Sequence, residues 1–285
     1  MKTISNCFIG CDKSFENSDL IIFGAPYDGT SSFRPGSRFA PDKIREASYG
    51  LETYSPDYNM DIEDLHISDI GNIEFPFGEK NKVFEKIKNC TADFSKMNKK
   101  ILCLGGEHLI TFPIIEVLSR SYDNLKVIHV DAHADMRDTY ISEKFSHATV
   151  LNNIAELIGQ KNIYHYGIRS GTREEFEKIA KYNNLNMKYN KLSEKIGNDP
   201  VYLTIDLDVL DTSVLPGTGT PEPGGLTFKE LSELLFSFKG FNFIGADVVE
   251  LAPDYDFTGA SSIVAAKVVR NTICTISRYA EIVNI

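Results

Sequence analysis

The chain has 285 residues, enough for a sizeable core, and its 42% hydrophobic and 25% charged residues are typical of a soluble globular protein. Forty acidic and 30 basic residues give a net charge of −10, which argues against nucleic acid or anionic membrane as a partner and favours cations. No apolar run could span a bilayer and residues 1–19 contain no signal-peptide core, so we expect a cytoplasmic protein.

Six short apolar runs predict β-strands. Each run is followed by a turn rich in glycine or acidic residues. Most are nearly continuous in apolar residues rather than alternating, which indicates strands buried on both faces, as in a parallel sheet. The predicted strands are residues 20–24, 101–104, 127–130, 163–166, 201–205 and 243–249.

The segments between these runs have the apolar spacing of helices. The predicted helices are residues 81–97, 111–121, 147–158, 173–182, 228–238 and 261–276. Strands that alternate with helices over the whole length predict a three-layer α/β fold. Since no linker, repeat or low-complexity segment interrupts the pattern, we expect a single domain over residues 1–285.

Two loops, residues 26–41 and 216–225, are unusually rich in glycine and proline. Long ordered loops of this kind often carry function, which is our expectation here. The alternative is that they are only long connections.

The predicted strand at 127–130 ends in Asp131-Ala132-His133-Ala134-Asp135. In an extended chain alternate residues point to the same side, so Asp131, His133 and Asp135 would face one cavity. Three such groups are costly to bury without a partner, and a divalent cation is the natural partner. The alternative, solvated acids in a loop, does not explain the apolar strand before them.

Two further predicted strands end in similar side chains, so the carboxyl ends of three strands could contribute to one crevice. The six candidate ligands are His108, Asp131, His133, Asp135, Asp206 and Asp208. Four carboxylates would neutralise two divalent cations, with a bridging hydroxide as the nucleophile. A ligand set without thiolates favours Mn²⁺ over structural zinc.

Several sequence blocks resemble those of the ureohydrolase family, which includes arginase and agmatinase. They are GGEH (105–108), DAHAD (131–135), TIDLDVLD (204–211), PGTGTPEPGG (216–225) and GADVVELAPDYD (245–256). The resemblance implies a single arginase-like α/β domain with a central, mostly parallel sheet flanked by helices. It also implies hydrolysis of a guanidino group at a binuclear manganese centre, with release of urea and an amine, in a trimer or hexamer.

Roles for individual residues also follow from this resemblance. One manganese would be held by His108, Asp131, Asp135 and Asp206, and the other by Asp131, His133, Asp206 and Asp208. Glu250 resembles the glutamate that binds the guanidinium, and His147 resembles the histidine that shuttles a proton to the leaving amine. His129 and His165 lie inside predicted strands, and we expect both to be core residues with satisfied hydrogen bonds.

The substrate is indicated by what the site lacks. Arginases hold the α-carboxylate and α-amine of arginine with an Asn and a Ser, where this chain has Arg137 and Glu143. The blocks DMRDTY, FSHATVLNN and YGIRSGTREEFE are more similar to agmatinases, so we predict hydrolysis of agmatine to putrescine and urea. Arg137 would repel the far amine of agmatine unless an acid such as Asp138 or Glu143 pairs with it. We also expect Thr220 to line the mouth of the site.

Other functions stay open at this point. A related ureohydrolase would act on guanidinobutyrate, to which an unpaired Arg137 is better suited, or on arginine or a formimino amino acid. A non-catalytic metal-binding paralogue would be expected to lack some of these residues, and all are present. A binuclear phosphoesterase would need a basic cluster for phosphate, and beyond Arg137 none adjoins these motifs.

Overall fold

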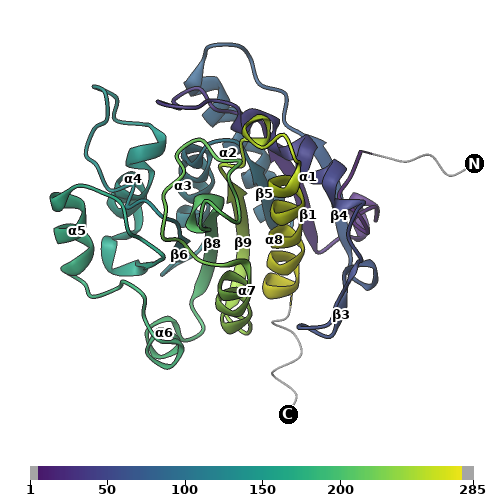
Figure 1. Ribbon diagram of the computed structural model, residues 1–285. Coiled ribbons are helices and arrows are strands. Elements are labelled where there is room, and N and C mark those ends of the chain that lie inside the picture. Colours follow the sequence, from purple (N-terminus) through teal and green to yellow (C-terminus); the bar gives the residue numbers. More distant parts are fainter. Residues whose placement is uncertain (1–5, 278–285) are drawn as a thin grey trace, which may run out of the picture.

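A parallel sheet of seven strands forms the central layer of the computed structural model, which describes residues 6–277 (Figure 1). The strand order is β4-β1-β5-β9-β8-β6-β7, and every pair in it is parallel. The strands are β1 (Leu20–Ala25), β4 (Ile67–Asn72), β5 (Lys100–Gly105), β6 (Lys126–Val130), β7 (Ile163–Tyr166), β8 (Pro200–Asp206) and β9 (Asn242–Val249). A separate antiparallel pair is formed by β2 (Tyr54–Ser55) and β3 (Met60–Asp61). All six predicted strands are present.

Helices cover both faces of the sheet, which gives the predicted three layers (Figure 1). One face packs against α1 (Ala40–Ser48), α6 (Tyr189–Ile196), α7 (Phe228–Ser237) and α8 (Ala260–Ser277). The other face packs against α2 (Lys80–Lys96), α3 (Thr111–Ser121), α4 (Val150–Ile158) and α5 (Arg173–Ala180). All six predicted helices are therefore present.

The nearly continuous apolar runs are explained by this double cover. In β5, Ile101 and Cys103 point into one hydrophobic core, and Leu102 and Leu104 point into the other. Successive side chains of a strand point to opposite faces, so a strand covered on both sides needs apolar residues at every position.

In the central sheet and the helices that cover it, three elements were not predicted from the sequence, and neither was the β2–β3 pair. β4 lies at the edge of the sheet and is only partly buried. Its sequence, ISDIGN, therefore contains no apolar run that would predict a strand. The side chain of its Asp69 is buried and paired with Arg45 of α1, which donates from Nε to Oδ2 over 2.8 Å. α1 begins at Ala40, before the expected end of the 26–41 loop, and α6 is a short helix with few apolar residues.

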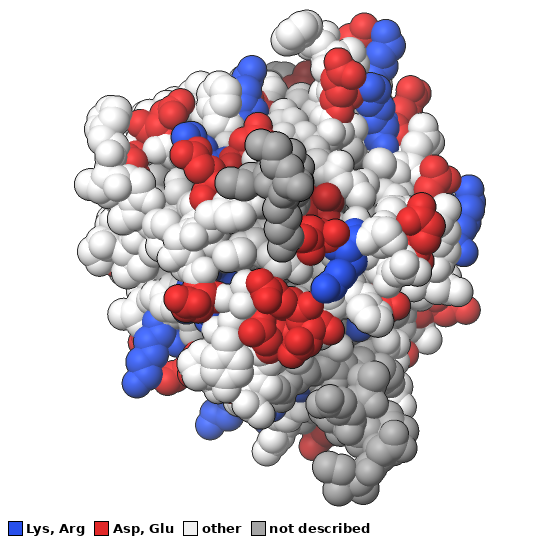
Figure 2. Space-filling view, turned by 90° about the vertical axis from the view of Figure 1, so that its right-hand side faces the viewer, with Lys and Arg blue, Asp and Glu red and all other residues white. Residues whose placement is uncertain are grey.

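Figure 2 shows the face of the molecule at the β4 edge of the sheet. Acidic side chains gather near the centre of this face and basic ones are scattered between and around them, in keeping with the net charge of −10. No helix within residues 6–277 is long and apolar enough to cross a membrane. The prediction of one domain over 1–285 includes residues outside this range and stays a prediction.

Candidate active site

The predicted site residues meet because four neighbouring strands, β5-β9-β8-β6, carry them at their carboxyl ends. His108 follows β5 in a short 3-10 helix (His108–Ile110), and Asp131 directly follows β6. Asp206 is the last residue of β8, and Glu250 directly follows β9. Since the carboxyl ends of parallel strands lie at one edge of a sheet, these side chains converge at its centre.

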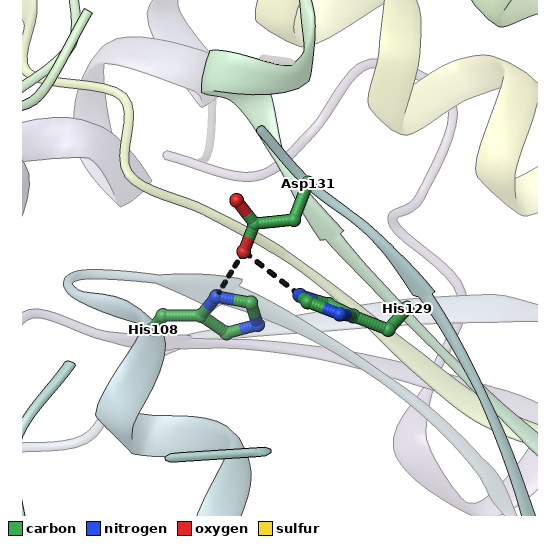
Figure 3. Close-up of side chains that lie close together, drawn as sticks. All are labelled: His108, His129 and Asp131. Atoms are coloured by element: carbon green, nitrogen blue, oxygen red, sulfur yellow. Dashed lines mark hydrogen bonds and ion pairs between the residues drawn. The ribbon is translucent and has the colours of Figure 1, made fainter. Parts of the chain in front are cut away.

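His108 lies at the centre of a first group of carboxylates. Its Nδ1 is 3.0 Å from Asp131 Oδ2, 3.4 Å from Asp135 Oδ2 and 3.5 Å from Asp206 Oδ2. Figure 3 shows the His108 ring turned toward the Asp131 carboxylate. Among the described residues this buried nitrogen has no partner with hydrogen-bond geometry.

The other ring nitrogen of His108 is held by a hydrogen-bond chain. Nε2 lies 2.8 Å from Thr204 Oγ1, and the Thr204 hydroxyl donates to Asp247 Oδ1 over 2.6 Å. Because Thr204 uses its hydrogen on Asp247, His108 must donate from Nε2, which leaves Nδ1 as a lone pair in the neutral ring. A nitrogen lone pair that faces three carboxylates fits a divalent cation, and the donor chain on the opposite nitrogen is typical of metal-binding histidines.

His133 lies in a second group that shares Asp131 with the first. Its Nδ1 is 2.8 Å from Asp208 Oδ2 and 3.8 Å from Asp131 Oδ1. The two oxygens of Asp131 therefore face different groups, Oδ2 toward His108 and Oδ1 toward His133. A residue shared by two cations needs this arrangement. Asp206 Oδ1 accepts the backbone N–H of Asp208 over 2.9 Å, which fixes the turn after β8.

The backbone reaches this geometry through a turn, so the predicted extended conformation after β6 is wrong. β6 ends at Val130, and Asp135 has a φ of 51°, in the left-handed region. The Asp135 carbonyl accepts the N–H groups of Leu151 and Asn152 at the start of α4, over 3.0 and 3.2 Å. These bonds hold a conformation that is unfavourable for Asp and aim its side chain at His108.

The electrostatics of the cluster favour cations. Burial and the charge of Asp131 raise the pKa of Asp135 to about 7, and burial also raises the pKa of Asp206 well above its usual value. Burial lowers the pKa of His133, but Asp208 and the other carboxylates outweigh it and raise this pKa to about 11. A cluster with these shifts favours positive charge, and bound cations would displace protons from it.

Glu250 is oriented by the backbone that follows β5. Its Oε1 accepts the N–H of His108 over 2.8 Å, and its own N–H donates to the Gly106 carbonyl over 2.9 Å. Its φ of 64° is again in the left-handed region. Burial and the nearby charge of Glu107 raise its pKa well above the usual value, so a cation that binds there would stabilise the charged form.

His147 lies in the 3-10 turn (His147–Thr149) before α4 and contacts the 26–41 loop. Its Nδ1 is 3.4 Å from Thr30 Oγ1, and its Nε2 is 3.3 Å from Ser32 Oγ. The Tyr140 ring packs edge-on against it, with centroids 5.6 Å apart. Burial lowers the pKa of His147 to about 4, so the ring is neutral near pH 7.

Thr30 and Glu107 are site residues that the sequence analysis missed. The Thr30 hydroxyl donates to Glu107 Oε1 over 2.6 Å, and the Thr30 N–H donates to Oε2 over 2.8 Å. Thr30 Oγ1 also accepts the N–H of His147 over 3.1 Å. Glu107 is fully buried, and burial raises its pKa to about 7. The available signals were the glycine-rich loop around Thr30 and the position of Glu107 beside His108.

Several of these side chains line a cavity of about 280 Å³. Its walls include Ser32, His133, Asp135, Arg137, Tyr140, His147, Ser170, Glu175, Asp206, Thr220 and Glu250. Thr220 lines the cavity as expected and lies 3.4 Å from Asp208 Oδ2. Both glycine- and proline-rich loops thus contribute to the cavity, through Ser32 and Thr220.

Arg137 is paired, but with a residue other than those expected. Its Nε lies 3.5 Å from Glu175 Oε2, and its guanidinium carbon lies 4.9 Å from the centre of the Tyr140 ring. The two expected partners bind lysines instead: Asp138 contacts Lys178 at 2.7 Å, and Glu143 contacts Lys80 at 2.6 Å.

Of the two core histidines, His129 has partners for both ring nitrogens, as expected. The expectation is wrong for His165, because its buried Nε2 has no hydrogen-bond partner among the described residues.

Comparisons with known proteins agree with this fold. A model of the arginase family matches residues 18–274. An agmatinase of Bacillus cereus is 42% identical over 275 residues, which are 93% of this chain and 94% of that protein. An N(1)-aminopropylagmatine ureohydrolase of Thermococcus kodakarensis is 34% identical over 276 residues, 93% of each protein. The crystal structure of the agmatine ureohydrolase of Thermoplasma volcanium superposes with a TM-score of 0.85 at 30% identity, covering 97% of this chain and 96% of that one.

The fold and the family match place the chain among the hydrolases of guanidino compounds. It belongs to the arginase family, and the resemblance drawn from its sequence blocks is confirmed. The arginase-like α/β fold is confirmed as well.

Proposed function

We propose that this protein is an agmatinase that hydrolyses agmatine to putrescine and urea at a site with two Mn²⁺ ions per subunit. The observation that carries the proposal is the convergence of six candidate ligands at the end of four adjacent strands, where three of them, His133, Asp135 and Asp206, line one cavity together with Glu250 and His147. The names of the Bacillus and Thermoplasma relatives support agmatine as the substrate.

The proposed ligand sets follow the two groups of side chains. His108, Asp131, Asp135 and Asp206 would hold one ion, and Asp131, His133, Asp206 and Asp208 would hold the other. Oxygen ligands with two imidazoles and no thiolate suit Mn²⁺. When bound, such ions supply Lewis-acid chemistry and lower the pKa of water enough to provide hydroxide near neutral pH.

Glu250 would bind and orient the planar guanidinium. One of its oxygens is held by the His108 N–H, which fixes the carboxylate plane relative to the carboxylate cluster. A charge-assisted hydrogen bond to the substrate would hold the guanidinium carbon in one position for attack. Because burial raises the pKa of Glu250, the cationic substrate would also restore its charged form.

His147 would carry a proton to the leaving group. Hydrolysis adds oxygen to the guanidinium carbon and breaks its bond to the chain nitrogen, which must gain a proton to leave as an amine. Thr30 Oγ1 accepts on the Nδ1 side of the ring, so Nε2 on the Ser32 side is the atom available for transfer. With a pKa of about 4, His147 would release any proton that it receives to a basic amine.

The pairing of Arg137 favours agmatine over a guanidino acid. Glu175 and the Tyr140 ring neutralise and shield its charge, so the cavity wall presents no free cation to hold a substrate carboxylate. Apart from the carboxylates proposed to bind the ions and the guanidinium, the cavity is lined by Glu175, so Arg137 meets an acid of the protein there rather than a substrate carboxylate. A substrate tail without a carboxylate, as in agmatine, suits this pairing.

The test is urea release by metal-depleted and Mn²⁺-loaded protein with four substrates at equal concentration. They are agmatine, arginine, 4-guanidinobutyrate and N(1)-aminopropylagmatine, the last because of the Thermococcus relative. We expect Mn²⁺-dependent urea release that is strongest with agmatine and abolished in His133→Ala. A preference for another of the four compounds would identify that compound as the substrate. If none of them gave urea at full metal loading, the proposed function would be refuted. The cytoplasmic location and the trimer or hexamer remain predictions.

A further inference from the structure

His129 and His165 form a buried hydrogen-bonded pair behind the candidate metal centre. They lie opposite each other on neighbouring strands, His129 on β6 and His165 on β7. Their Nδ1 atoms are 2.9 Å apart, and both side chains are almost completely buried. The other ring nitrogen of His129, Nε2, is 2.8 Å from Asp131 Oδ2, the oxygen that also faces His108 (Figure 3).

The positions of the hydrogen atoms in this series of hydrogen bonds follow from the chemistry of the side chains. Both oxygens of Asp131 lie where an ionised carboxylate accepts hydrogen bonds, Oδ2 beside His129 Nε2 and Oδ1 beside the N–H of His133. A carboxylate oxygen is only an acceptor, so His129 must donate from Nε2. The neutral His129 ring then has a lone pair at Nδ1, and His165 must donate to it from its own Nδ1.

The protonation state of the pair follows from the surroundings of His165 Nε2, the ring nitrogen that does not face His129. Its Nε2 is buried and has no partner within residues 6–277. If His129 were a cation, it would donate from Nδ1, and His165 would have to carry its hydrogen on Nε2, as an unpaired buried donor. With both rings neutral, Nε2 is an unpaired acceptor instead, and no buried N–H is left without a partner.

We propose that His129 and His165 form a neutral relay that positions Asp131 in the metal centre, and that His129 is not itself a metal ligand. The proposal rests on the metal centre of the proposed function. His108, His129 and Asp131 are close enough to suggest a three-residue metal site, but both His129 nitrogens are already engaged by Asp131 and His165. Donation from His165 strengthens the Nε2–H of His129 as a donor, because linked hydrogen bonds polarise one another.

The relay has a defined effect on Asp131. The bond from His129 fixes Oδ2, and the N–H of His133 donates to Oδ1 over 2.5 Å. Both oxygens are thus held before any ion binds, one toward each group of ligands. Donors of this kind on a metal-binding carboxylate contribute about 10- to 100-fold in metal affinity. His129 and His165 are therefore positioning residues, because neither contacts the substrate cavity.

The test compares pairs of variants that keep or remove each donor. His129→Gln retains an N–H near the position of Nε2, and His129→Leu removes it. His165→Asn retains an N–H near the position of Nδ1, and His165→Leu removes it. His66→Leu is the control, since His66 is exposed and contacts only Asp19 among the described ion pairs. Thermal unfolding of the metal-free proteins shows whether each variant folds.

Mn²⁺ binding by calorimetry is the first measurement, because it does not depend on activity. We expect His129→Leu to lose about 10- to 100-fold in affinity for at least one ion and His165→Leu to lose roughly 3- to 10-fold. The Gln and Asn variants are expected to stay within about 3-fold of the wild type. In activity assays the two Leu variants are expected to lower kcat with little change in KM.

Imidazole ¹⁵N NMR is the second measurement and tests the hydrogen positions directly. We expect His129 to carry its hydrogen on Nε2 and His165 on Nδ1, and both to keep them when diamagnetic Cd²⁺ is added. Loss of the His129 hydrogen on Cd²⁺ addition would show that His129 binds the ion, and this result would overturn the proposal. Folded Leu variants that bind Mn²⁺ like the wild type would overturn it as well. A wild type that binds no Mn²⁺ would instead refute the metal centre, and this proposal with it.

Discussion

Arg137 and Glu175 form an ion pair in the wall of the active-site cavity, with Arg137 Nε 3.5 Å from Glu175 Oε2. Glu175 is buried, and its oxygens also accept the backbone N–H groups of Met136 and Thr172. The acid is thus held in place by the backbone of two chain segments, and Arg137 lies beside it. This pair determines the charge that a substrate tail meets.

Substitution of Glu175 by Gln is expected to change the substrate preference. It leaves Arg137 unpaired, so we expect kcat/KM for agmatine to fall roughly 3- to 10-fold and that for 4-guanidinobutyrate to rise, because a free cation repels an amine and attracts a carboxylate. The measurement is kcat/KM for both substrates. Arg137→Gln in the same background should restore the wild-type ratio, and additive effects of the two changes would contradict the pairing.

Glu250→Gln is expected to weaken guanidinium binding while the metal ligands stay intact. Loss of a charge-assisted hydrogen bond is worth about 1.5–3 kcal/mol, so kcat/KM should fall roughly 10- to 100-fold. Mn²⁺ stoichiometry, measured by metal analysis after gel filtration, should be unchanged. Full activity of the variant would contradict a role for Glu250 in substrate binding.

Thr30→Val is expected to lower kcat about 10-fold with little effect on KM, because it removes the hydroxyl between Glu107 and His147. Thr30→Ser keeps the hydroxyl and is the matched control. Steady-state kinetics across pH would show a changed profile for the Val variant only. Equal losses in both variants would assign Thr30 a packing role instead.

Mn²⁺ binding is expected to release protons and to strengthen as the pH rises. In the metal-free protein His133 has a pKa of about 11 and Asp135 a pKa of about 7, so His133 holds a proton at neutral pH and Asp135 holds about half of one. A cation must displace these protons, and the dependence should steepen below pH 7, where Asp135 becomes fully protonated. Calorimetry in two buffers of different ionisation enthalpy measures the release. An affinity that does not change between pH 6 and 9 would contradict the proposed ligands.

The sequence by itself determined the layers of the fold and the identity of the candidate ligands. Strands covered on both faces need apolar residues at every position, which makes them visible as continuous runs such as 127–130 and 201–205. The edge strand β4 has partly exposed residues and no apolar run, so it was missed, whereas β7 at the other edge is buried at every position and was predicted. The ligand residues were visible because acids and histidines directly after buried strands have few structural explanations.

Only the tertiary structure decided how these residues are arranged. The strand order brings β5, β9, β8 and β6 side by side, although β5 and β9 are far apart in the chain. Several features of the site depend on contacts between distant segments. They are the left-handed backbone of Asp135, the ion pair of Arg137 with Glu175, and the link from Glu107 through Thr30 to His147. Local sequence patterns report burial and periodicity, but a contact between distant segments depends on how the whole sheet is assembled, so it becomes visible only in the folded chain.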